Sequence, residues 1–313
     1  MGIYLVTGAA GFIGSSLCRA LIQRGDEVRG MDNFFSGKPE NIAAIRSQMD
    51  FREADLLDMA AVRDACAGVE FIFHEAAIPS VPRSVADPQR SHEANLTGTL
   101  NLLVAARDAK VKRVIYASSS SVYGETPTLP KKEEMAPAPI SPYAVQKAGA
   151  ELYMKSFHQV YGLETTALRY FNIFGPWQDP ASQYSGVVAK FCLRMLRGEQ
   201  PEIYGDGEQS RDFTFIDNAV RANLLAAAAP ALKAAGRTFN IACGRRVTLN
   251  EVARCLRELT GYTGDIIHRA ERPGDIRDSL ADISLARTAL GYEPTTTYER
   301  GLELTVAWYR QMA

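Results

Sequence analysis

A glycine-rich turn near the N-terminus constrains the fold more than any other stretch of the chain. An apolar, β-like run at residues 3–6 leads directly into Thr7-Gly8-Ala9-Ala10-Gly11-Phe12-Ile13-Gly14. The pattern that follows predicts an amphipathic helix to about Arg24 and then a strand over residues 27–31, with Asp32 at its end. This order of strand, glycine-rich turn, helix, strand and acid is the context that a dinucleotide-binding site requires.

The residues of this turn have distinct physical roles. Gly8 allows the tight turn, Gly11 lets backbone N–H groups approach a pyrophosphate, and Gly14 lets helix and strand pack closely. The helix N-terminus adds partial positive charge. Asp32, eighteen residues after Gly14, is placed to accept from ribose hydroxyls, and its carboxylate repels a 2′-phosphate. The turn therefore predicts NAD rather than NADP, the alternative being a structural βα turn.

Strands and helices continue to alternate over the first half of the chain. This rhythm predicts an α/β fold with a Rossmann-type doubly wound parallel sheet. The expected strands cover 49–53, 71–74, 114–117 and 165–172, and the expected helices cover 59–67, 86–109 and 143–160. Asp55-Leu56 and Glu75-Ala76-Ala77 follow two of these strands, and the small alanines leave room for a cofactor or simply pack.

The regular alternation of predicted strands and helices ends after residue 171. We expect residues 1–171 to form an NAD-binding domain, with part of 212–240 returning to it, and residues 172–313 to form mainly a smaller α+β substrate-binding lobe. The loops expected there cover 173–185, 199–212 and 262–281, around a helix over 186–198. The cationic groups of this half suit a diphosphate, although ordinary surface charge is the alternative; they are Lys190, Arg194, Arg197, Arg269, Arg272 and Arg277.

Charge and composition exclude several classes of function. The 313 residues carry 35 basic and 36 acidic side chains, so a net charge of −1 indicates neither nucleic acid nor an anionic membrane as partner. No apolar run approaches the ~18–20 residues of a membrane span, and we expect no signal peptide. The 5 cysteines form no Cys-x-x-Cys pair and the 4 histidines form no cluster, so we expect free thiols in the cytoplasm and no metal.

A second motif lies between Ser118 and Lys147. Ser141 and Pro142 predict a helix start, so Tyr143 and Lys147 share one helical face. An ammonium beside a phenol lowers a pKa that starts near ~10. A serine hydroxyl about twenty-four residues earlier, at the end of a strand, could share a substrate proton with the phenol. The group is typical of general acid–base catalysis, although Tyr-x-x-x-Lys also occurs by chance on surface helices.

With these motifs in order, the whole chain resembles the extended short-chain dehydrogenase/reductase family, and within it the nucleotide-sugar 4-epimerases, such as those of UDP-N-acetylglucosamine and UDP-galactose. The resemblance implies that Ser119, Tyr143 and Lys147 are catalytic. It also implies an NAD site made of Gly8, Gly11, Phe12, Ile13, Gly14, Asp32, Asn33, Ser36, Gly37, Asp55, Leu56, Ala76, Ala77, Asn95, Tyr143, Lys147 and Tyr170.

The resemblance also implies a UDP-sugar site in the second lobe. Arg211 and Arg272 match positions that clamp the diphosphate, Asp275 matches the one that holds the uridine ribose, and residues 202–204 match the strand beside the uracil. The implied substrate residues are Ser80, Ser119, Ser120, Tyr143, Asn172, Gly186, Val187, Tyr204, Arg211, Arg272, Asp275 and Ser279.

A few positions separate the reactions of this family. Ser120 and Ser121 stand where related dehydratases carry an acid pair, which disfavours elimination and decarboxylation. Related UDP-glucuronate epimerases usually have Thr where Asn172 stands and lack Gln-Asp-Pro, found here at residues 178–180. Ser279 stands where epimerases restricted to glucose and galactose carry a large aromatic, so a serine leaves room for an N-acetyl group unless it is merely a loop residue. Pro79, where some relatives have Gly, leaves the preference between acetylated and plain sugars open.

The sequence thus predicts NAD-dependent C4 epimerisation of UDP-hexoses, acetylated ones included, through a 4-keto intermediate. The resemblance implies a homodimer through a four-helix bundle formed by residues 92–109 and 143–160, although burial against the sheet explains much of the same pattern. The alternatives are a UDP-glucuronate 4-epimerase, another NAD-dependent nucleotide-sugar oxidoreductase, or a catalytically inactive binding protein of the same fold.

Overall fold

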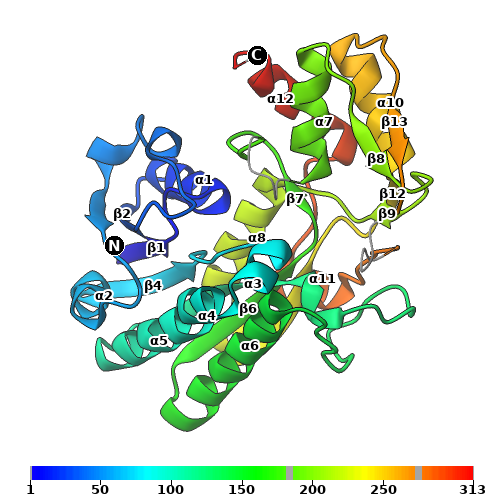
Figure 1. Cartoon of the computed structure of the whole chain (residues 1–313). Helices are drawn as coiled ribbons and strands as arrows, with labels where there is room; N and C mark the ends of the chain where they lie inside the picture. Colours follow the sequence, from blue (N-terminus) through cyan, green and yellow to red (C-terminus); the bar gives the residue numbers. More distant parts are fainter. Residues whose placement is uncertain (1, 181–185, 272–276, 313) are drawn as a thin grey trace.

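A parallel sheet of seven strands forms the centre of the molecule (Figure 1). The computed structural model describes residues 2–180, 186–271 and 277–312. The strand order is β11-β6-β5-β4-β1-β2-β3, so the direction of winding reverses between β1 and β4. The strands are β1 Ile3–Thr7, β2 Glu27–Asp32, β3 Asp50–Glu53, β4 Val69–His74, β5 Arg113–Ser119, β6 Glu164–Tyr170 and β11 Arg237–Ile241. The predicted doubly wound fold is therefore confirmed.

Helices cover both faces of this sheet because both faces of its strands are apolar. Leu5 and Val6 are consecutive on β1, yet each is buried in a different core cluster. Ile72 and Phe73 on β4 likewise belong to different core clusters, because successive side chains of a strand point to opposite faces of the sheet. One face carries α1 Phe12–Gln23, α8 Ile216–Ala228, α9 Ala231–Ala234 and α11 Ser284–Leu290, and the other carries α2 Met59–Cys66, α5 Gly98–Asp108 and α6 Pro142–Tyr161.

The prediction of one continuous helix over 86–109 is wrong, because the structure divides this range into several elements. The structure has two short helices, α3 Val81–Ala86 and α4 Pro88–His92, then a π-helical turn over Glu93–Thr97 that leads into α5. Asp87 has φ −141° and ψ 82°, outside the helical region, because the following proline disfavours helical backbone there. Its side chain accepts from Arg90 N at 3.0 Å and so begins α4.

The second half contains more structure than the sequence predicted. The ranges expected to be loops hold β7, β9 and β13 as well as the expected strand at 202–204, and these short strands pair in small sheets as β10-β7, β12-β9 and β13-β8. Such strands are too short to show a period in the sequence. The elements here are β7 Ile173–Phe174, α7 Val187–Leu196, β8 Glu202–Tyr204, β9 Ser210–Arg211, β10 Thr214–Phe215, β12 Val247–Thr248, α10 Leu249–Thr260, β13 Ile267–Arg269 and α12 Tyr298–Tyr309.

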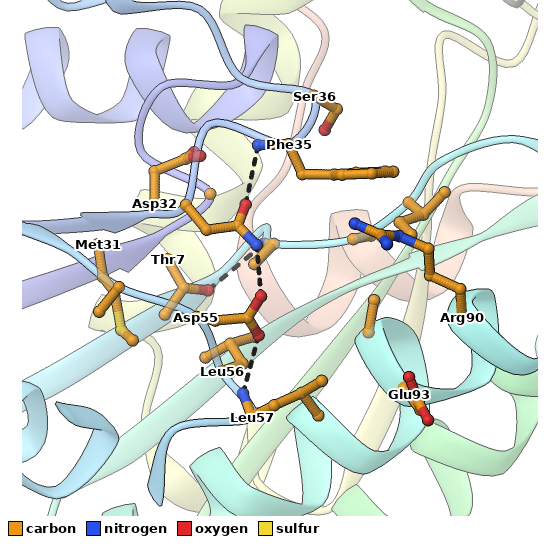
Figure 2. A pocket seen from close by; sticks show the side chains of 17 residues that line it. Thr7, Met31, Asp32, Phe35, Ser36, Asp55, Leu56, Leu57, Arg90 and Glu93 are labelled. Atoms are coloured by element: carbon orange, nitrogen blue, oxygen red, sulfur yellow. Dashed lines mark hydrogen bonds between the residues drawn. The ribbon is translucent and has the colours of Figure 1, made fainter. Parts of the chain in front are cut away.

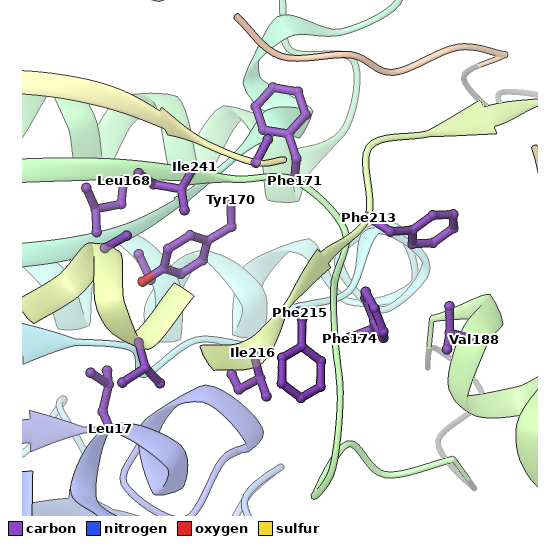
Figure 3. Close-up of a cluster of buried hydrophobic side chains, with 14 of the residues drawn as sticks. Leu17, Leu168, Tyr170, Phe171, Phe174, Val188, Phe213, Phe215, Ile216 and Ile241 are labelled. Atoms are coloured by element: carbon purple, nitrogen blue, oxygen red, sulfur yellow. The ribbon is translucent and has the colours of Figure 1, made fainter. Parts of the chain in front are cut away.

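One hydrophobic cluster runs from the sheet into the second half (Figure 3). It joins Leu17 of α1 and Leu168 of β6 to Phe174 and Phe215, which lie on the paired strands β7 and β10. The rings of these two phenylalanines meet edge-on, with centroids 5.7 Å apart. Both α8 and β11 return to the sheet, and β11 pairs with β6. The domain division at residue 171 stays a prediction.

Candidate active site

The glycine-rich turn forms a close-packed cradle at the C-terminal end of β1. Gly8 has φ +69°, and a Cβ there would lie 2.7 Å from Ala76 N. A Cβ at Gly14 would lie 2.0 Å from the carbonyl oxygen of Gly8, so neither position accepts a larger residue without rearrangement. Gly11 is the N-cap of α1, and no side chain among the described residues caps this helix end. The N–H groups of its first turn, which include Phe12 and Ile13, can therefore bind an anion.

The Asp32 carboxylate is fixed beside this cradle. Its Oδ2 accepts from Ala10 N at 2.9 Å and its Oδ1 accepts from Phe34 N at 2.7 Å. Asp32 is only 7% exposed, and this burial raises the pKa of the carboxyl, while the two hydrogen bonds lower it. A Cβ at Gly37 would lie 2.8 Å from Oδ2, so this glycine lets the following loop close over the acid.

A pocket opens between Asp32 and the ends of β3 and β4 (Figure 2). Asn33 donates to Asp55 Oδ2 at 2.6 Å, and Asp55 Oδ1 accepts from Leu57 N at 2.9 Å, which ties two strand ends together. The structure brings the following predicted cofactor residues to the wall of this pocket: Gly8, Asp32, Asn33, Ser36, Asp55, Leu56, Ala76 and Ala77.

Several lining residues were missed from the sequence, above all Phe35, Leu57 and Arg90. Phe35 is 41% exposed, and the Arg90 guanidinium lies 4.3 Å from its ring centroid, so the two side chains pack together at the pocket (Figure 2). A phenylalanine soon after Asp32 was the available signal for Phe35. The arginine comes from α4, and no local pattern links the two positions.

The other predicted cofactor residues do not line this pocket, and two of them, Asn95 and Tyr170, are occupied by contacts within the protein. Asn95 is buried behind the pocket wall, where its Oδ1 accepts from Ile78 N at 2.7 Å and its Nδ2 donates to Ile78 O. Ile78 lines the pocket, so Asn95 supports the wall from behind. Tyr170 is turned toward α8, where its hydroxyl accepts from Asn223 Nδ2 at 2.6 Å (Figure 3). Direct contact of either residue with a cofactor stays a prediction.

The predicted catalytic residues gather where β5 and α6 meet. Ser119 ends β5 and hydrogen-bonds to Tyr143, and Lys147 follows one turn later on α6. Ser141 caps α6 by accepting from Ala144 N at 3.2 Å, as the sequence predicted. Tyr143 N also donates to Ser84 Oγ at 3.0 Å, which fixes the start of α6 against α3.

Burial dominates the electrostatics of Tyr143. Burial raises the pKa of its phenol to about 12; the hydrogen bond with Ser119 lowers it and the Glu75 carboxylate raises it. The Lys147 ammonium donates to Ala117 O at 2.7 Å, and it lies 5.8 Å from the Tyr143 ring centroid. Burial also lowers the pKa of Lys147 to about 8. The prediction that Lys147 lowers the pKa of the tyrosine together with the positively charged nicotinamide stays a prediction, and burial of the phenol acts in the opposite direction.

Glu75 is the functional candidate that the sequence offered without a role. It directly follows β4, and its Oε1 accepts from the Tyr170 hydroxyl at 2.8 Å. Burial raises the pKa of Glu75 to about 7, while Tyr170 and Lys147 lower it. A charged residue between an apolar strand and the Ala76-Ala77 pair was the available signal.

The predicted substrate residues lie in several short elements. Ser80 caps α3 by accepting from Arg83 N at 3.1 Å, and Asn172 has φ +38° with its Nδ2 3.5 Å from Asp212 O. Arg211 on β9 donates to Ser210 O, and Ser279 N donates to the same carbonyl at 3.1 Å, so these two positions are neighbours. The Tyr204 hydroxyl donates to Glu202. Of the others, Ser120 begins the turn after β5, Gly186 and Val187 begin α7, and Arg272 and Asp275 lie outside the described residues.

Metal ligands and membrane spans are lacking in the part of the chain that the structure describes. In the described ranges, no group of three or more His, Cys, Asp or Glu side chains is placed to hold a metal ion. No helix in this part of the chain is long and apolar enough to cross a membrane. The five cysteines are free thiols.

Comparison with known proteins assigns the chain to a family. Residues 4–242 match the NAD dependent epimerase/dehydratase family. The chain belongs to this family. The UDP-glucose 4-epimerase of Mycolicibacterium smegmatis is 38% identical over 311 residues, which cover 98% of each protein. The family resemblance found in the sequence is therefore confirmed.

Solved structures agree over nearly the whole chain. The UDP-N-acetylglucosamine 4-epimerase from Methanobrevibacter ruminantium M1, in complex with UDP-N-acetylmuramic acid, has a TM-score of 0.95 at 41% identity and covers 100% of this chain and 99% of that one. The UDP-glucose 4-epimerase of Thermus thermophilus, in complex with NAD, has a TM-score of 0.90 at 36% identity and covers 99% of this chain and 100% of that one.

NAD is the cofactor of this family, and the residues present fit it. The uncapped N–H groups at the start of α1 suit a pyrophosphate, and Gly8 and Gly14 let the backbone around this helix end pack closely. Asp32 and the pocket beside Phe35 suit an adenosine, with a carboxylate for the ribose and an aromatic wall for the base. The enzyme thus has the parts that an NAD-dependent reaction needs.

Proposed function

We propose that this enzyme interconverts UDP-hexoses by epimerisation at C4 through a 4-keto intermediate. The observation that carries the proposal is the cluster of Ser119, Tyr143 and Lys147 beside an NAD site, with serines rather than acids at positions 120 and 121. The proposed substrates are UDP-glucose and UDP-galactose together with their N-acetylated counterparts.

In this proposal Tyr143 is the acid–base group. As a phenolate it takes the proton from the C4 hydroxyl, and Ser119 stabilises the oxygen through its hydrogen bond to the same phenol. When bound, NAD supplies the hydride acceptor and donor at C4. Because the side chains alone hold the pKa of Tyr143 near 12, forming the phenolate at neutral pH requires further positive charge, at about 1.4 kcal/mol for each pKa unit.

The residues after Ser119 restrict the chemistry that follows. Elimination of water needs a carboxylic acid near the sugar, and Ser120 and Ser121 supply only hydroxyls. With elimination disfavoured at these two positions, the 4-keto sugar receives hydrogen again, and Tyr143 returns the proton to its oxygen. Presenting the opposite face of the sugar requires a firmly held diphosphate and a loosely held ring. Arg211 is suited to hold the diphosphate, and the small side chain of Ser279 nearby leaves the sugar ring room to turn.

Ser279 supports acceptance of acetylated sugars. It is half-buried beside Ser210 and has no bulk to fill the space around the sugar C2 position. Asn172 is a weaker guide, because φ +38° favours Asn over a β-branched Thr whatever the substrate is.

The test is side-by-side turnover of UDP-glucose, UDP-N-acetylglucosamine and UDP-glucuronate by the purified enzyme. We expect interconversion of the first two with their C4 epimers and no net change in absorbance at 340 nm. Stoichiometric consumption of reduced cofactor would instead identify a one-way oxidoreductase. Turnover of UDP-glucuronate alone would overturn the choice of sugars.

We also propose a homodimer, in the cytoplasm, through α5 and α6. The outer face of α6 carries Val145, Leu152 and Val160 at helical spacing, and the last two are each 68% exposed. Pairing this face with its symmetry copy would bury these side chains in a four-helix bundle. Replacing both Leu152 and Val160 by Glu should give a monomer by light scattering; an unchanged mass would exclude this interface. The free thiols suit a reducing compartment.

A further inference from the structure

One acid beside the catalytic cluster has no part in the proposed proton transfer. Glu75 projects from the end of β4 to the end of β6, although β5 lies between these strands in the sheet. Tyr170 donates to Glu75, and Asn223 of α8 donates to Tyr170 in turn. Tyr170 is 8% exposed and Asn223 is fully buried. Three separate elements therefore fix the position of one carboxylate.

The location of Glu75 in the sheet places it at the nicotinamide end of the cofactor site. The adenosine pocket lies at the ends of β2 and β3 and reaches Ala76 and Ala77 after β4, and the phosphate cradle lies at β1 next to the reversal of winding. A dinucleotide that crosses this point continues over the ends of β4 and β5. Glu75 stands there, directly before Ala76, which packs against Gly8.

The charge of Glu75 reaches the reacting groups. The groups that face it are Lys147 and Tyr143 from α6, Tyr116 from β5 and Tyr170 from β6, and the carboxylate raises the pKa of all four. Among the described residues, no Lys or Arg forms an ion pair with Glu75. Lys147 is the cation that lowers its pKa, and burial outweighs that effect. Above its pKa of about 7, Glu75 thus carries a partly buried negative charge that the side chains of the site only partly balance.

We propose that Glu75 is a positioning residue for the nicotinamide half of the site, where its carboxylate, held by Tyr170, favours the positively charged oxidised ring over the neutral reduced ring. This inference rests on the proposed epimerisation, in which every hydride taken from C4 must be given back. A carboxylate that stabilises the oxidised ring makes that return favourable. The same negative charge raises the pKa of Tyr143, so Glu75 affects both the hydride transfer and the proton transfer.

The test measures the reduction potential of the cofactor in the holoenzyme, not turnover. Wild-type, Glu75→Gln and Glu75→Asp enzymes are equilibrated anaerobically with a redox dye of known potential, and the reduced nicotinamide is read at 340 nm. Glu75→Gln keeps an oxygen for the Tyr170 hydroxyl and removes only the charge. At a fixed ratio of reduced to oxidised dye, we expect the ratio of reduced to oxidised cofactor in Glu75→Gln to rise about tenfold. This corresponds to an increase of about 30 mV in the reduction potential of the two-electron couple. Glu75→Asp keeps the charge and should stay within about threefold of wild type.

The matched control is Glu70→Gln, which removes the same charge from the same strand at an exposed position beside Lys112. It should leave the ratio unchanged. A ratio for Glu75→Gln within about threefold of wild type would overturn the inference, and so would an equal shift in Glu70→Gln.

Tyr170→Phe covers the case in which Glu75→Gln fails to fold or to retain NAD. It removes the donor that favours the carboxylate, so the ratio should move in the same direction by a smaller factor. No movement in this variant would overturn the inference. Failure of the proposed function has a different signature, namely a wild-type enzyme that turns over no UDP-hexose while the shift in Glu75→Gln is still measured.

Discussion

The cofactor side of the site is built from backbone and buried small residues, whereas the proposed sugar side is built from long side chains on short strands. Asp32 is fixed by two backbone N–H groups, and Gly8 and Gly14 leave no space for a Cβ. Arg211 instead sits on a two-residue strand beside Arg277, whose ion pair with Asp206 is exposed. Exposed ion pairs contribute little to stability.

This contrast shows where the molecule tolerates change. A substitution on the cofactor side displaces backbone that also packs the sheet, so it affects both binding and folding. A substitution on the sugar side changes a side chain whose backbone is held elsewhere. We therefore expect substrate preference to change by single residues on the sugar side while the cofactor side stays constant.

The largest expected effect comes from the residue that serves both sides. Tyr143→Phe removes the acid–base hydroxyl and should lower kcat by at least about 1,000-fold. The variant should still release a full complement of NAD on denaturation, because the ring remains in place. Tyr153→Phe, at an exposed position on the same helix, is the matched control. Near-normal turnover by Tyr143→Phe would remove the tyrosine from its proposed role.

The next effect breaks the cofactor side alone. A Cβ at position 14 meets the carbonyl oxygen of Gly8 at 2.0 Å, so Gly14→Ala should displace the cradle and lower the NAD content at least tenfold, roughly the scale of a backbone clash. The NAD released per protein and the Tm measure this change. Gly149→Ala is the control, because its Cβ would make an ordinary contact 3.4 Å from Leu96. Full NAD content in Gly14→Ala would show that the cradle is not the phosphate site.

The sugar side is tested by Ser279→Tyr. The ring should fill the space proposed for the N-acetyl group and lower kcat/KM for UDP-N-acetylglucosamine about 100-fold, while UDP-glucose is affected far less. Ser279→Ala should accept both sugars as the wild type does. Equal loss of both activities in Ser279→Tyr would reject Ser279 as the determinant of sugar size, without affecting the conclusions about the cofactor side.

The smallest effect concerns the acid sensitivity of the cofactor side. His74 is buried between Thr7 and Thr99, and burial lowers its pKa to about 3. Since the unfolded histidine titrates near ~6.5, the folded state binds fewer protons between these values, and its stability falls as the pH falls below about 6.5. Going from pH 7 to pH 5 should cost about 2 kcal/mol in the free energy of unfolding by urea.

His74→Gln provides the comparison for this experiment, because it keeps polar contacts without a titrating group. The difference between the two proteins isolates the histidine from carboxyls such as Asp212, whose raised pKa acts in the opposite sense. Parallel pH dependence in both proteins would show that His74 does not titrate on unfolding.

Local patterns predicted the parts of the site that lie close together in sequence. The glycine turn, Asp32 and the helix start at Ser141 follow from turn chemistry and capping. The pairs that join distant segments could not be predicted. Arg90 meets Phe35 from α4, which is separated from α3 at Asp87, whose proline neighbour was overlooked.

The pKa of Tyr143, the proposed catalytic tyrosine, also could not be predicted from the sequence. Spacing placed Lys147 near Tyr143, but spacing gives no measure of burial, and burial decides the pKa of both groups. Glu75 shows the same limitation, because its partner Tyr170 lies two strands away in the sheet and 95 residues along the chain.

The hydrophobic cluster that runs from Leu17 through Phe174 to Phe215 has a consequence for how such enzymes diversify. Because the sheet and the second half share one core, the second half is not an exchangeable module that could be grafted from a relative in one recombination event. We therefore expect the second half of a relative to fit this sheet only if the core residues at the junction are transferred with it.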